Sequence, residues 1–424
     1  MKIAILGGGF TGLTASYDLV KKKHRVTLFE KEKFLGGLAQ GFRGEKWEWS
    51  LERAYHHLFA SDTDILNFAK EVGFKKIFFR SPETASLYQT GQPTNNYRIF
   101  PVDSPQDFLK LPILSLGDRL RSGMVLALLK FFPFLPIYER FSSEKFIRRF
   151  MGEKAWKVMW EDLFRKKFGK YAGNILAVFM WARIHKRTKK LGYVEGGFQT
   201  FVDYLEEINV RLGVKIQKGT IVRQITKKGD GFIVSGEYFD VVISTLPTPI
   251  LAKLAETVLP ESYTSRFKKL KYLNAVVLII ENREKILDKT YWLNICTPDM
   301  PLMFVGQHTN FVEKKHYNNN HLAYVGWYVD YDSPLLRMDE KQLVDFIRPS
   351  VKKINPEFKI SESKVYLFKA PFAQSIFDKD FLVNKPEFVT PVKNFFIANL
   401  DMTYPYDRGT NFAVQLGREV AKLC

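Results

Sequence analysis

Residues 2–12 read KIAILGGGFTG, and they are the strongest indication of the fold. Residues 2–6 form a short apolar run that predicts a buried strand. Three glycines follow in GxGxxG spacing. Gly7 allows the sharp turn out of the strand, Gly9 lets the backbone approach a pyrophosphate, and Gly12 lets the next helix pack closely on the sheet.

The residues after the glycines complete a nucleotide-binding unit. Phe10 and Thr11 open the predicted helix, whose N-terminus is expected to face the phosphates. Residues 25–30 (RVTLFE) then predict a second strand that ends in an acid, Glu30. A carboxylate at this point accepts hydrogen bonds from the adenosine ribose and repels a 2′-phosphate. The unit therefore predicts an α/β, Rossmann-like fold that binds either FAD or NAD.

The next ten residues favour FAD. Residues 30–39 (EKEKFLGGLA) resemble the second half of the dinucleotide motif in the superfamily of FAD enzymes that contains amine oxidases, protoporphyrinogen oxidases and phytoene desaturases. In that group a glycine pair lets the chain pass beside the pyrophosphate and the flavin. The resemblance implies non-covalent FAD in a GR2-type flavoprotein, with Lys31, Gly37, Leu38 and Ala39 among the contacts.

The resemblance continues in the middle of the chain, where residues 191–201 (LGYVEGGFQTF) are similar to the family's glycine pair that opens a helix. The elements expected next are a helix over 201–212, strands over 215–226 and 231–235, and a buried strand that ends in a proline turn over 240–247. By the same resemblance, the strand around Val222 offers its backbone to adenine, and Thr245 lies near the cofactor.

The C-terminal part departs from the family pattern. Residues 394–400 predict a final strand and residues 410–423 a helix. The family usually has Gly-Asp after this strand, and its Asp holds the ribityl chain. Here the chain reads Asn-Leu-Asp, so the contact comes from Asp401, from Asn399 or from a main-chain group. The helix start at Asn411 is expected to face the flavin C2 carbonyl and to stabilise negative charge on the reduced ring.

A second resemblance points to UDP-galactopyranose mutases, a related flavin family. Residues 55–62 (YHHLFASD) are similar to the mutase's His-x-Phe stretch, in which a histidine at the position of His57 lies against the flavin. Residues 404–407 resemble its Tyr-Tyr-Asp stretch, but Asn399 replaces the flavin-contacting Arg. Tyr406 either forms an aromatic wall opposite the flavin or packs in the core.

His308 is a further catalytic candidate, because residues 306–311 (GQHTNF) follow a predicted strand over 302–305. Polar groups at a strand exit line cavities in many enzymes, although a lone histidine is more often a hydrogen-bonded structural residue. We therefore take His57, Tyr406 and His308 as the catalytic candidates. The two cysteines form no metal-binding or disulfide pattern, so we expect no metal site and a reducing, cytoplasmic location.

We expect a discontinuous FAD-binding domain interrupted by two insertions that form an α+β substrate domain. The FAD-binding segments are 1–75, 190–270 and 385–424, and the insertions are 76–189 and 271–384. Helices are expected over 118–130, 143–151 and 153–168, and strands over 275–280 and 322–329. The sequence leaves the oligomeric state open.

The charge of the chain is strongly positive, because 64 Lys and Arg face 45 Asp and Glu for a net charge of +19. Such a surface attracts anionic lipids or nucleotide-linked substrates, but no nucleic-acid-binding motif accompanies it. Residues 123–138 (GMVLALLKFFPFLPIY) are the most apolar stretch and fit either a buried helix or a surface that dips into a bilayer at the inner face of the membrane. We expect the buried helix.

Three functions fit these observations. The first is a redox enzyme in which a hydride passes from a C–H bond of a small or lipid-like substrate to flavin N5. The second is a redox-neutral, mutase-like enzyme for a nucleotide-linked sugar, which needs cations such as Arg98, Arg183 and Arg408 at the substrate pyrophosphate. The third is a flavin-binding scaffold associated with a membrane.

Overall fold

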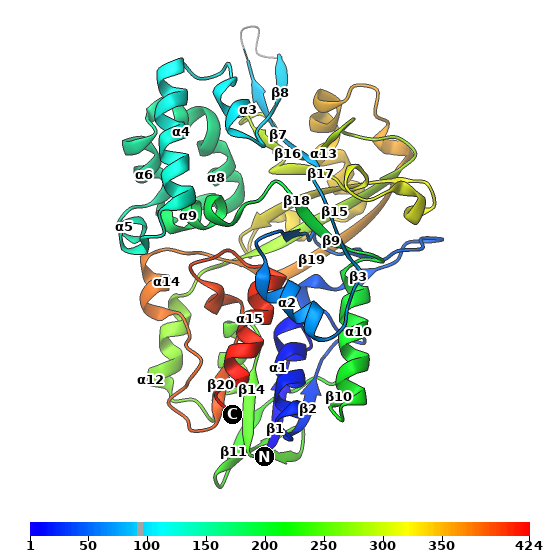
Figure 1. Ribbon diagram of the computed structural model, residues 1–424, viewed down its shortest axis with the longest axis vertical. Coiled ribbons are helices and arrows are strands. Elements are labelled where there is room, and N and C mark those ends of the chain that lie inside the picture. The colour runs from blue at the N-terminus through cyan, green and yellow to red at the C-terminus, as the bar shows by residue number, and fades with distance from the viewer. Residues whose placement is uncertain (91–95) are drawn as a thin grey trace.

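The computed structural model describes residues 1–90 and 96–424, and it has two bodies stacked along its long axis (Figure 1). The lower body contains a five-stranded parallel sheet in the order β10-β2-β1-β14-β20. Its strands are β1 (Lys2–Leu6), β2 (Arg25–Phe29), β10 (Lys215–Gln217), β14 (Val241–Ser244) and β20 (Phe395–Ile397). Segments far apart in the sequence therefore build one sheet, which is the arrangement of a Rossmann-like domain.

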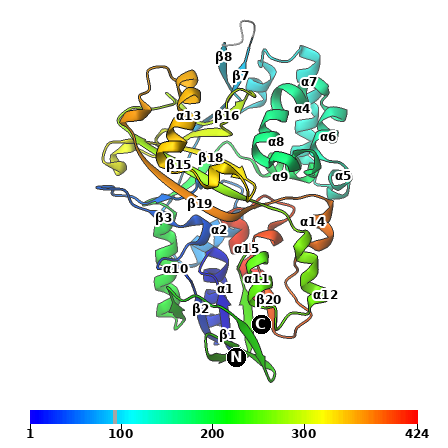
Figure 2. The same cartoon turned by 180° about the vertical axis from the view of Figure 1, so that it is seen from behind.

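Both faces of the parallel sheet are covered, as its continuously apolar strands require. Ile3 and Ile5 of β1 face the core that includes α1 (Phe10–Lys21), α10 (Phe198–Arg211) and α15 (Thr410–Ala421). Ala4 and Leu6 face the opposite core, which includes α11 (Thr248–Leu254) and the hairpin after β10. Figure 2 shows α11 and α12 (Glu261–Thr264) on that side.

The upper body is built on a seven-stranded mixed sheet in the order β19-β15-β18-β17-β16-β7-β8. These strands are β7 (Glu83–Gln89), β8 (Tyr97–Pro101), β15 (Tyr272–Asn282), β16 (Thr290–Cys296), β17 (Phe304–Gln307), β18 (His321–Val329) and β19 (Lys364–Ser375). The helix α13 (Glu340–Ile354) packs on one face through Leu343, Ile347 and Val351. Both long insertions of the sequence thus share one sheet.

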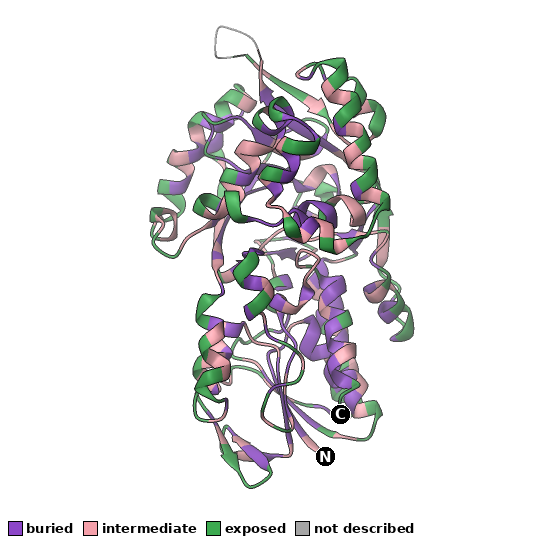
Figure 3. Ribbon diagram, turned by 90° about the vertical axis from the view of Figure 1, so that its left-hand side faces the viewer, coloured by how far each residue is buried: buried purple, intermediate pink, exposed green. Residues whose placement is uncertain are grey.

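A group of helices lies beside the mixed sheet (Figure 1). It comprises α3 (Pro105–Leu109), α4 (Leu116–Phe131), α5 (Leu135–Arg140), α6 (Ser143–Phe150), α7 (Glu153–Ala155), α8 (Glu161–Phe168) and α9 (Ala177–Lys186). The helix α9 is the most buried of them, whereas Figure 3 shows wide exposed surfaces on the outer helices. The helix expected over 153–168 is interrupted by a wider turn at Trp156–Trp160 between α7 and α8.

Short elements connect the two bodies. They are β3 (Gly41–Phe42), β4 (Leu51–Glu52), β5 (Leu58–Phe59), α2 (Thr63–Glu71), β6 (Ile77–Arg80), β9 (Leu191–Val194) and α14 (Lys379–Asn384). The antiparallel sheet of β11 (Ile225–Lys228), β12 (Gly231–Val234) and β13 (Glu237–Phe239) lies instead at the far end of the lower body, where it packs on one face of the parallel sheet. The strand β9 pairs with both β5 and β6, so the two sides of the first insertion meet in one small sheet. This pairing fixes residues 55–59 between the bodies.

The strand expected over 215–226 is wrong. The strand β10 ends at Gln217, and the next strand, β11, begins at Ile225. Gly219 has a φ of +66°, which turns the chain. The backbone N–H groups of Gly219 and Thr220 then donate to the carbonyls of Glu32 and Glu30, so this segment follows the end of β2 instead of pairing as a strand.

The buried helix expected within 123–138 is also wrong. The helix α4 buries only Ser122 and Leu129, and Met124 and Phe131 are 69% and 80% exposed. The helix α4 carries apolar side chains on more than one face, and only one face packs against α9, so the others remain exposed. Within the part of the chain that the structure describes, no helix has the length and apolar character needed to cross a membrane.

Candidate functional site: a flavin cradle between the two bodies

The glycine turn after β1 has the geometry that the sequence predicts. Gly7 has a φ of +106°, a region that favours glycine. A Cβ at Gly12 would lie 2.0 Å from the Gly7 carbonyl oxygen, so a side chain there would push α1 away from the turn. The helix begins after Gly9 with no side-chain cap and no acid in its first turn. Its first N–H groups therefore remain available to an anion.

The glycine pair of residues 36 and 37 crosses this turn at close range. The Gly36 N–H donates to the Gly8 carbonyl at 2.9 Å. A Cβ at Gly37 would lie 3.3 Å from the Gly9 Cα, and one at Gly9 would lie 3.9 Å from the Gly37 Cα. Side chains at these two positions would fill the space between the two segments. The absence of side chains leaves a cradle of bare backbone, which fits a bound dinucleotide pyrophosphate.

Glu30 lies at the edge of this cradle. Its carboxylate accepts hydrogen bonds from the Gly8 N–H at 2.8 Å and from the Glu32 N–H at 2.9 Å. These bonds hold the acid at the end of β2, beside the turn, where a ribose is expected. Lys31, by contrast, is exposed and pairs with Glu32 at 3.5 Å.

The other predicted nucleotide contacts occupy different environments. Thr245 follows β14, and its hydroxyl donates to the Leu6 carbonyl at 2.8 Å beside the glycine turn. Leu38 is exposed and Ala39 is buried in the short turn after the glycine pair. Val222 is half-buried in the irregular segment between β10 and β11, so it is not part of a strand. Phe10 points into the core and contacts Phe201 edge to face, which leaves its main chain for the cradle.

Where the chain departs from the family pattern, the side chains of Asp401 and Asn399 form hydrogen bonds inside the protein. Asp401 is 1% exposed and accepts hydrogen bonds from the hydroxyls of Thr248, Tyr272 and Ser375. Burial raises the pKa of this carboxyl, and the three donors only partly offset that effect. The Asn399 amide donates to the Leu246 carbonyl at 2.9 Å. Both side chains thus join β14, β15 and β19 to the C-terminal segment.

The helix α15 begins close to α1 and α2. A Cβ at Gly417 would lie 2.6 Å from the Thr11 carbonyl oxygen, so α15 packs tightly against the start of α1. The Asn411 side chain accepts from the Ile65 N–H at 3.1 Å and donates to Asp64 at 3.0 Å. The residue before the helix, Gly409, provides no side-chain cap. The first turn of α15 therefore offers main-chain donors near residues 55–64.

His57 lies between the bodies among aromatic side chains. Its Nδ1 lies 3.3 Å from the Tyr291 hydroxyl, and its ring contacts Phe59 edge to face. Burial, followed by the charge of Arg187, lowers the pKa of His57 to about 3. The imidazole is therefore neutral at physiological pH and acts as a hydrogen-bonding group, not as a cation.

Among the described residues, the three catalytic candidates share no hydrogen bond or ring contact with one another. Tyr406 stacks on Phe412 with ring centroids 4.7 Å apart and contacts Trp181, so it forms part of an aromatic surface at the start of α15. His308 is buried, and its Nε2 lies 2.8 Å from the Tyr317 hydroxyl. Burial lowers the pKa of His308 to about 3. His308 is thus a buried, hydrogen-bonded histidine, and its catalytic role stays a prediction.

Two arrangements of charged residues become visible only in the structure. Glu52 is fully buried and accepts hydrogen bonds from the Tyr193 hydroxyl and the Phe198 N–H, both at 2.7 Å. Burial raises the pKa of Glu52 to about 7, although these donors lower it in part. The second arrangement is a charged cluster formed by Lys167, Arg183, Asp407 and Arg408. No local pattern predicts either arrangement, because the partners of Glu52 lie more than a hundred residues away, and Lys167 and Arg183 lie more than two hundred residues from Asp407.

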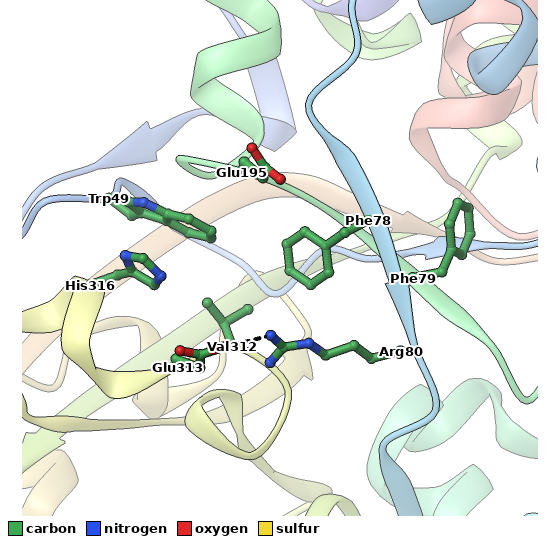
Figure 4. Close-up of a pocket in the computed structure, with 8 residues that line it drawn as sticks. All are labelled: Trp49, Phe78, Phe79, Arg80, Glu195, Val312, Glu313 and His316. Carbon is green, nitrogen blue, oxygen red and sulfur yellow. Dashed lines mark hydrogen bonds and ion pairs between the residues drawn. The ribbon is translucent and has the colours of Figure 1, made fainter.

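A surface pocket of about 320 Å³ lies apart from the predicted site residues (Figure 4). Trp49 and His316 stack on one side, with ring centroids 3.8 Å apart. Phe78 and Arg80 of β6 form the other side, and Arg80 pairs with Glu313 at 2.8 Å. The lining contains none of the residues that build the cradle.

The parallel sheet and the glycine cradle define a dinucleotide-binding protein of the Rossmann type. A family model described as flavin containing amine oxidoreductase matches residues 10–423. The chain belongs to this family and is a flavin oxidoreductase. The zeta-carotene desaturase of Zea mays is 27% identical over 133 residues, which are 30% of this chain and 23% of the desaturase. The match thus spans about a quarter of that relative.

Solved structures share the fold over the whole chain. An oxidoreductase from Methanosarcina mazei superposes with a TM-score of 0.77 at 19% identity and covers 100% of both chains. A triple mutant of putrescine oxidase gives 0.76 at 15% identity, covering 99% of this chain and 98% of the other. Reduced UDP-galactopyranose mutase gives 0.73 at 15% identity, covering 100% and 94%. At these identities the likeness concerns the fold.

Proposed function

We propose that the chain binds FAD non-covalently and oxidises a small or lipid-like organic substrate by hydride transfer from a C–H bond. The observation that carries this proposal is the bare-backbone cradle between Gly9 and Gly37, with Glu30 at its edge. When bound, FAD supplies the hydride acceptor, N5 of its ring. The protein's own residues would bind and orient the two reactants and exclude water.

We assign different roles in this reaction to the two bodies and to the residues between them. The lower body, with segments 1–75, 190–270 and 385–424, would hold the nucleotide, and segments 76–189 and 271–384 would form the substrate domain. His57 and Tyr406 would line the ring from the two ends of the interface, with the first turn of α15 providing donors for negative charge on it. Since Asp401 and Asn399 are engaged inside the protein, we assign the ribityl contact to a main-chain group.

The test begins with the purified protein. Its visible spectrum reports bound flavin, and acid precipitation followed by chromatography shows whether intact FAD is released into the supernatant. The oxidised protein is then mixed anaerobically with a panel of amines and polyprenes. Bleaching of the flavin absorbance by one of these compounds is the expected result. Protein that stays colourless after incubation with FAD would contradict the proposal.

A mutase-like reaction is a second candidate, favoured by the convergence of Arg183 and Arg408 on Asp407. Arg98, the third cation considered, lies on β8 in the upper sheet and takes no part in this cluster. The same experiment separates the candidates, because a mutase converts a UDP-sugar only when its flavin has been reduced, and an oxidase bleaches with its substrate.

We also propose that the face of α4 contacts an anionic membrane surface. Leu116, Leu120, Met124 and Leu128 repeat every four residues and are all at least 49% exposed, and Phe131 continues their stripe. The acids nearby are engaged: Asp118 with Ser115, Glu139 with Tyr404 and Glu144 with Arg148. The exposed cations near the stripe include Arg121, Arg140, Lys145 and Arg149, and the exposed Glu153 of α7 is paired with Arg148. An apolar stripe bordered by cations matches an anionic bilayer.

A further inference from the structure

Three cations converge on one carboxylate where the two bodies meet. Lys167 of α8 and Arg183 of α9 each place a nitrogen 3.1 Å from Asp407 Oδ2. Arg408 lies 3.9 Å from Oδ1 of the same carboxylate. Arg408 also donates to the hydroxyl of Tyr328 on β18 and to Gln374 on β19. Elements of the helical group, the mixed sheet and the C-terminal segment thus meet at this cluster.

The cluster carries more positive than negative charge. Three basic side chains face one carboxylate, so the two guanidinium groups alone leave one positive charge without a counter-ion, and any charge on Lys167 adds to it. The side chains of Lys167, Asp407 and Arg408 are only 14%, 19% and 22% exposed, so water compensates them poorly. Burial lowers the pKa of Lys167 to about 7, and Arg183 and Arg408 add to this effect against the opposing charge of Asp407. An added anion would relieve this repulsion.

The cluster adjoins the place where the reacting end of a substrate is expected. Arg408 directly precedes Gly409, after which α15 begins with uncapped N–H groups. The positive charge of Arg408 also acts electrostatically on Tyr55 and His56, which directly precede the flavin candidate His57. Arg183 is the most accessible cation of the set, with 46% of its side chain exposed. A ligand can therefore approach the cluster from the side of α9.

We propose that Lys167, Arg183 and Arg408 form a subsite for a phosphate group of the substrate. This inference rests on the proposed function, because it assigns the substrate of that oxidoreductase to the phosphorylated compounds. A phosphate dianion would balance the excess charge of the arginines and of a protonated Lys167, whereas a carboxylate carries only one negative charge. Arg183 spends only Nη1 on Asp407 and provides the guanidinium donors that phosphate oxygens accept, whereas Arg408 donates to Gln374 and Tyr328 and contributes its charge.

The test uses the flavin-loaded protein, in which the cradle after β1 is already occupied. Inorganic pyrophosphate is titrated in a calorimeter at constant ionic strength, with acetate as the carboxylate probe. We expect Arg183→Gln to weaken pyrophosphate binding about 10- to 100-fold, as the loss of one charge-assisted contact implies. Arg98→Gln is the matched control, because Arg98 is an exposed arginine of β8 outside the cluster. It should bind like the wild type.

Several outcomes would overturn the inference. Equal affinities of Arg183→Gln and Arg98→Gln would do so, as would wild-type protein that binds acetate as tightly as pyrophosphate or binds neither. The visible spectrum of the same sample reports the flavin independently. If the protein contains flavin but does not bind pyrophosphate, only the proposed subsite is contradicted. If the protein contains no flavin, the proposed function is contradicted. In that case the comparison of the two variants, carried out on the flavin-free chain, still decides the subsite.

Discussion

Gly12 shows how a single hydrogen atom in place of a side chain sets the position of a helix. A Cβ at residue 12 would lie only 2.0 Å from the Gly7 carbonyl oxygen, which is far too close for two non-bonded atoms. We expect Gly12→Ala to displace α1 from the turn and to weaken flavin retention by at least about tenfold, a cost of ~1.4 kcal/mol or more. Flavin absorbance per protein after gel filtration measures the effect.

A matched control for this variant is Gly123→Ala. Gly123 lies within α4, and a Cβ there would meet no atom within 4 Å. Alanine favours a helix over glycine by about 1 kcal/mol, so this variant should keep its flavin and gain slightly in stability. Equal flavin loss in the two variants would show that the turn is not the determinant.

Glu52 predicts a pH dependence of stability. Its pKa in the folded protein is about 7, above the ordinary value of 4.5. The folded state thus holds the proton more tightly than the unfolded state. The free energy of unfolding should therefore fall as pH rises from about 4.5 to about 7, at a slope of at most about 1.4 kcal/mol per unit from this group.

Denaturant titrations of wild type and Glu52→Gln across this pH range isolate the contribution. The difference between the two should change with pH between about 4.5 and 7 and level off above it. The exposed Glu256 provides the control, since Glu256→Gln should follow the wild type. A constant difference between wild type and Glu52→Gln over the whole range would refute the raised pKa.

At the scale of elements, the contact between α1 and α15 holds the nucleotide side of the site together. Gly417 makes this contact possible, because a Cβ there would lie 2.6 Å from the Thr11 carbonyl and 2.8 Å from the Thr14 Cβ. We expect Gly417→Ala to destabilise the protein by about 1–3 kcal/mol through overpacking. The midpoint of thermal unfolding, followed by flavin fluorescence, should fall by several degrees. An unchanged midpoint would mean that the helices separate without cost.

The elements also show which parts of the fold the sequence predicts. The strand, glycine turn, helix and second strand of residues 2–29 are confirmed, because each step is fixed by neighbours in the sequence. The strand over 215–226 was wrong because hydrogen bonds to the end of β2 hold that segment, and such a partner has no local signal. His308 shows the same limit, since its burial depends on strands that meet only in three dimensions.

At the scale of the whole molecule, the stripe on α4 predicts how the protein meets lipid. We expect it to bind vesicles of phosphatidylserine and phosphatidylcholine more tightly than neutral vesicles. The double variant Met124→Glu with Phe131→Glu should weaken this binding by at least about tenfold, because each side chain contributes roughly 1.5–3 kcal/mol when buried. Vesicle flotation measures it.

The control for the vesicle experiment is Val210→Glu. Val210 is an apolar residue of α10 with 54% exposure, on the lower body. It should bind vesicles like the wild type. Similar losses in the double variant and in Val210→Glu would indicate a general effect of added negative charge, and the stripe would then have no special role.

The order of strands in the parallel sheet has a consequence for biogenesis. The strand β20 (Phe395–Ile397) pairs with β14, and α15 (Thr410–Ala421) lies against α1, so the first and last parts of this chain are neighbours. During synthesis, β1 and its glycine turn leave the ribosome long before α15, one of the helices that cover this face of the sheet, has been made. The coverage of the parallel sheet stays incomplete until these residues have been translated. Cofactor loading is therefore expected to follow synthesis, and damage near the C-terminus should yield flavin-free protein even when every cradle residue is intact.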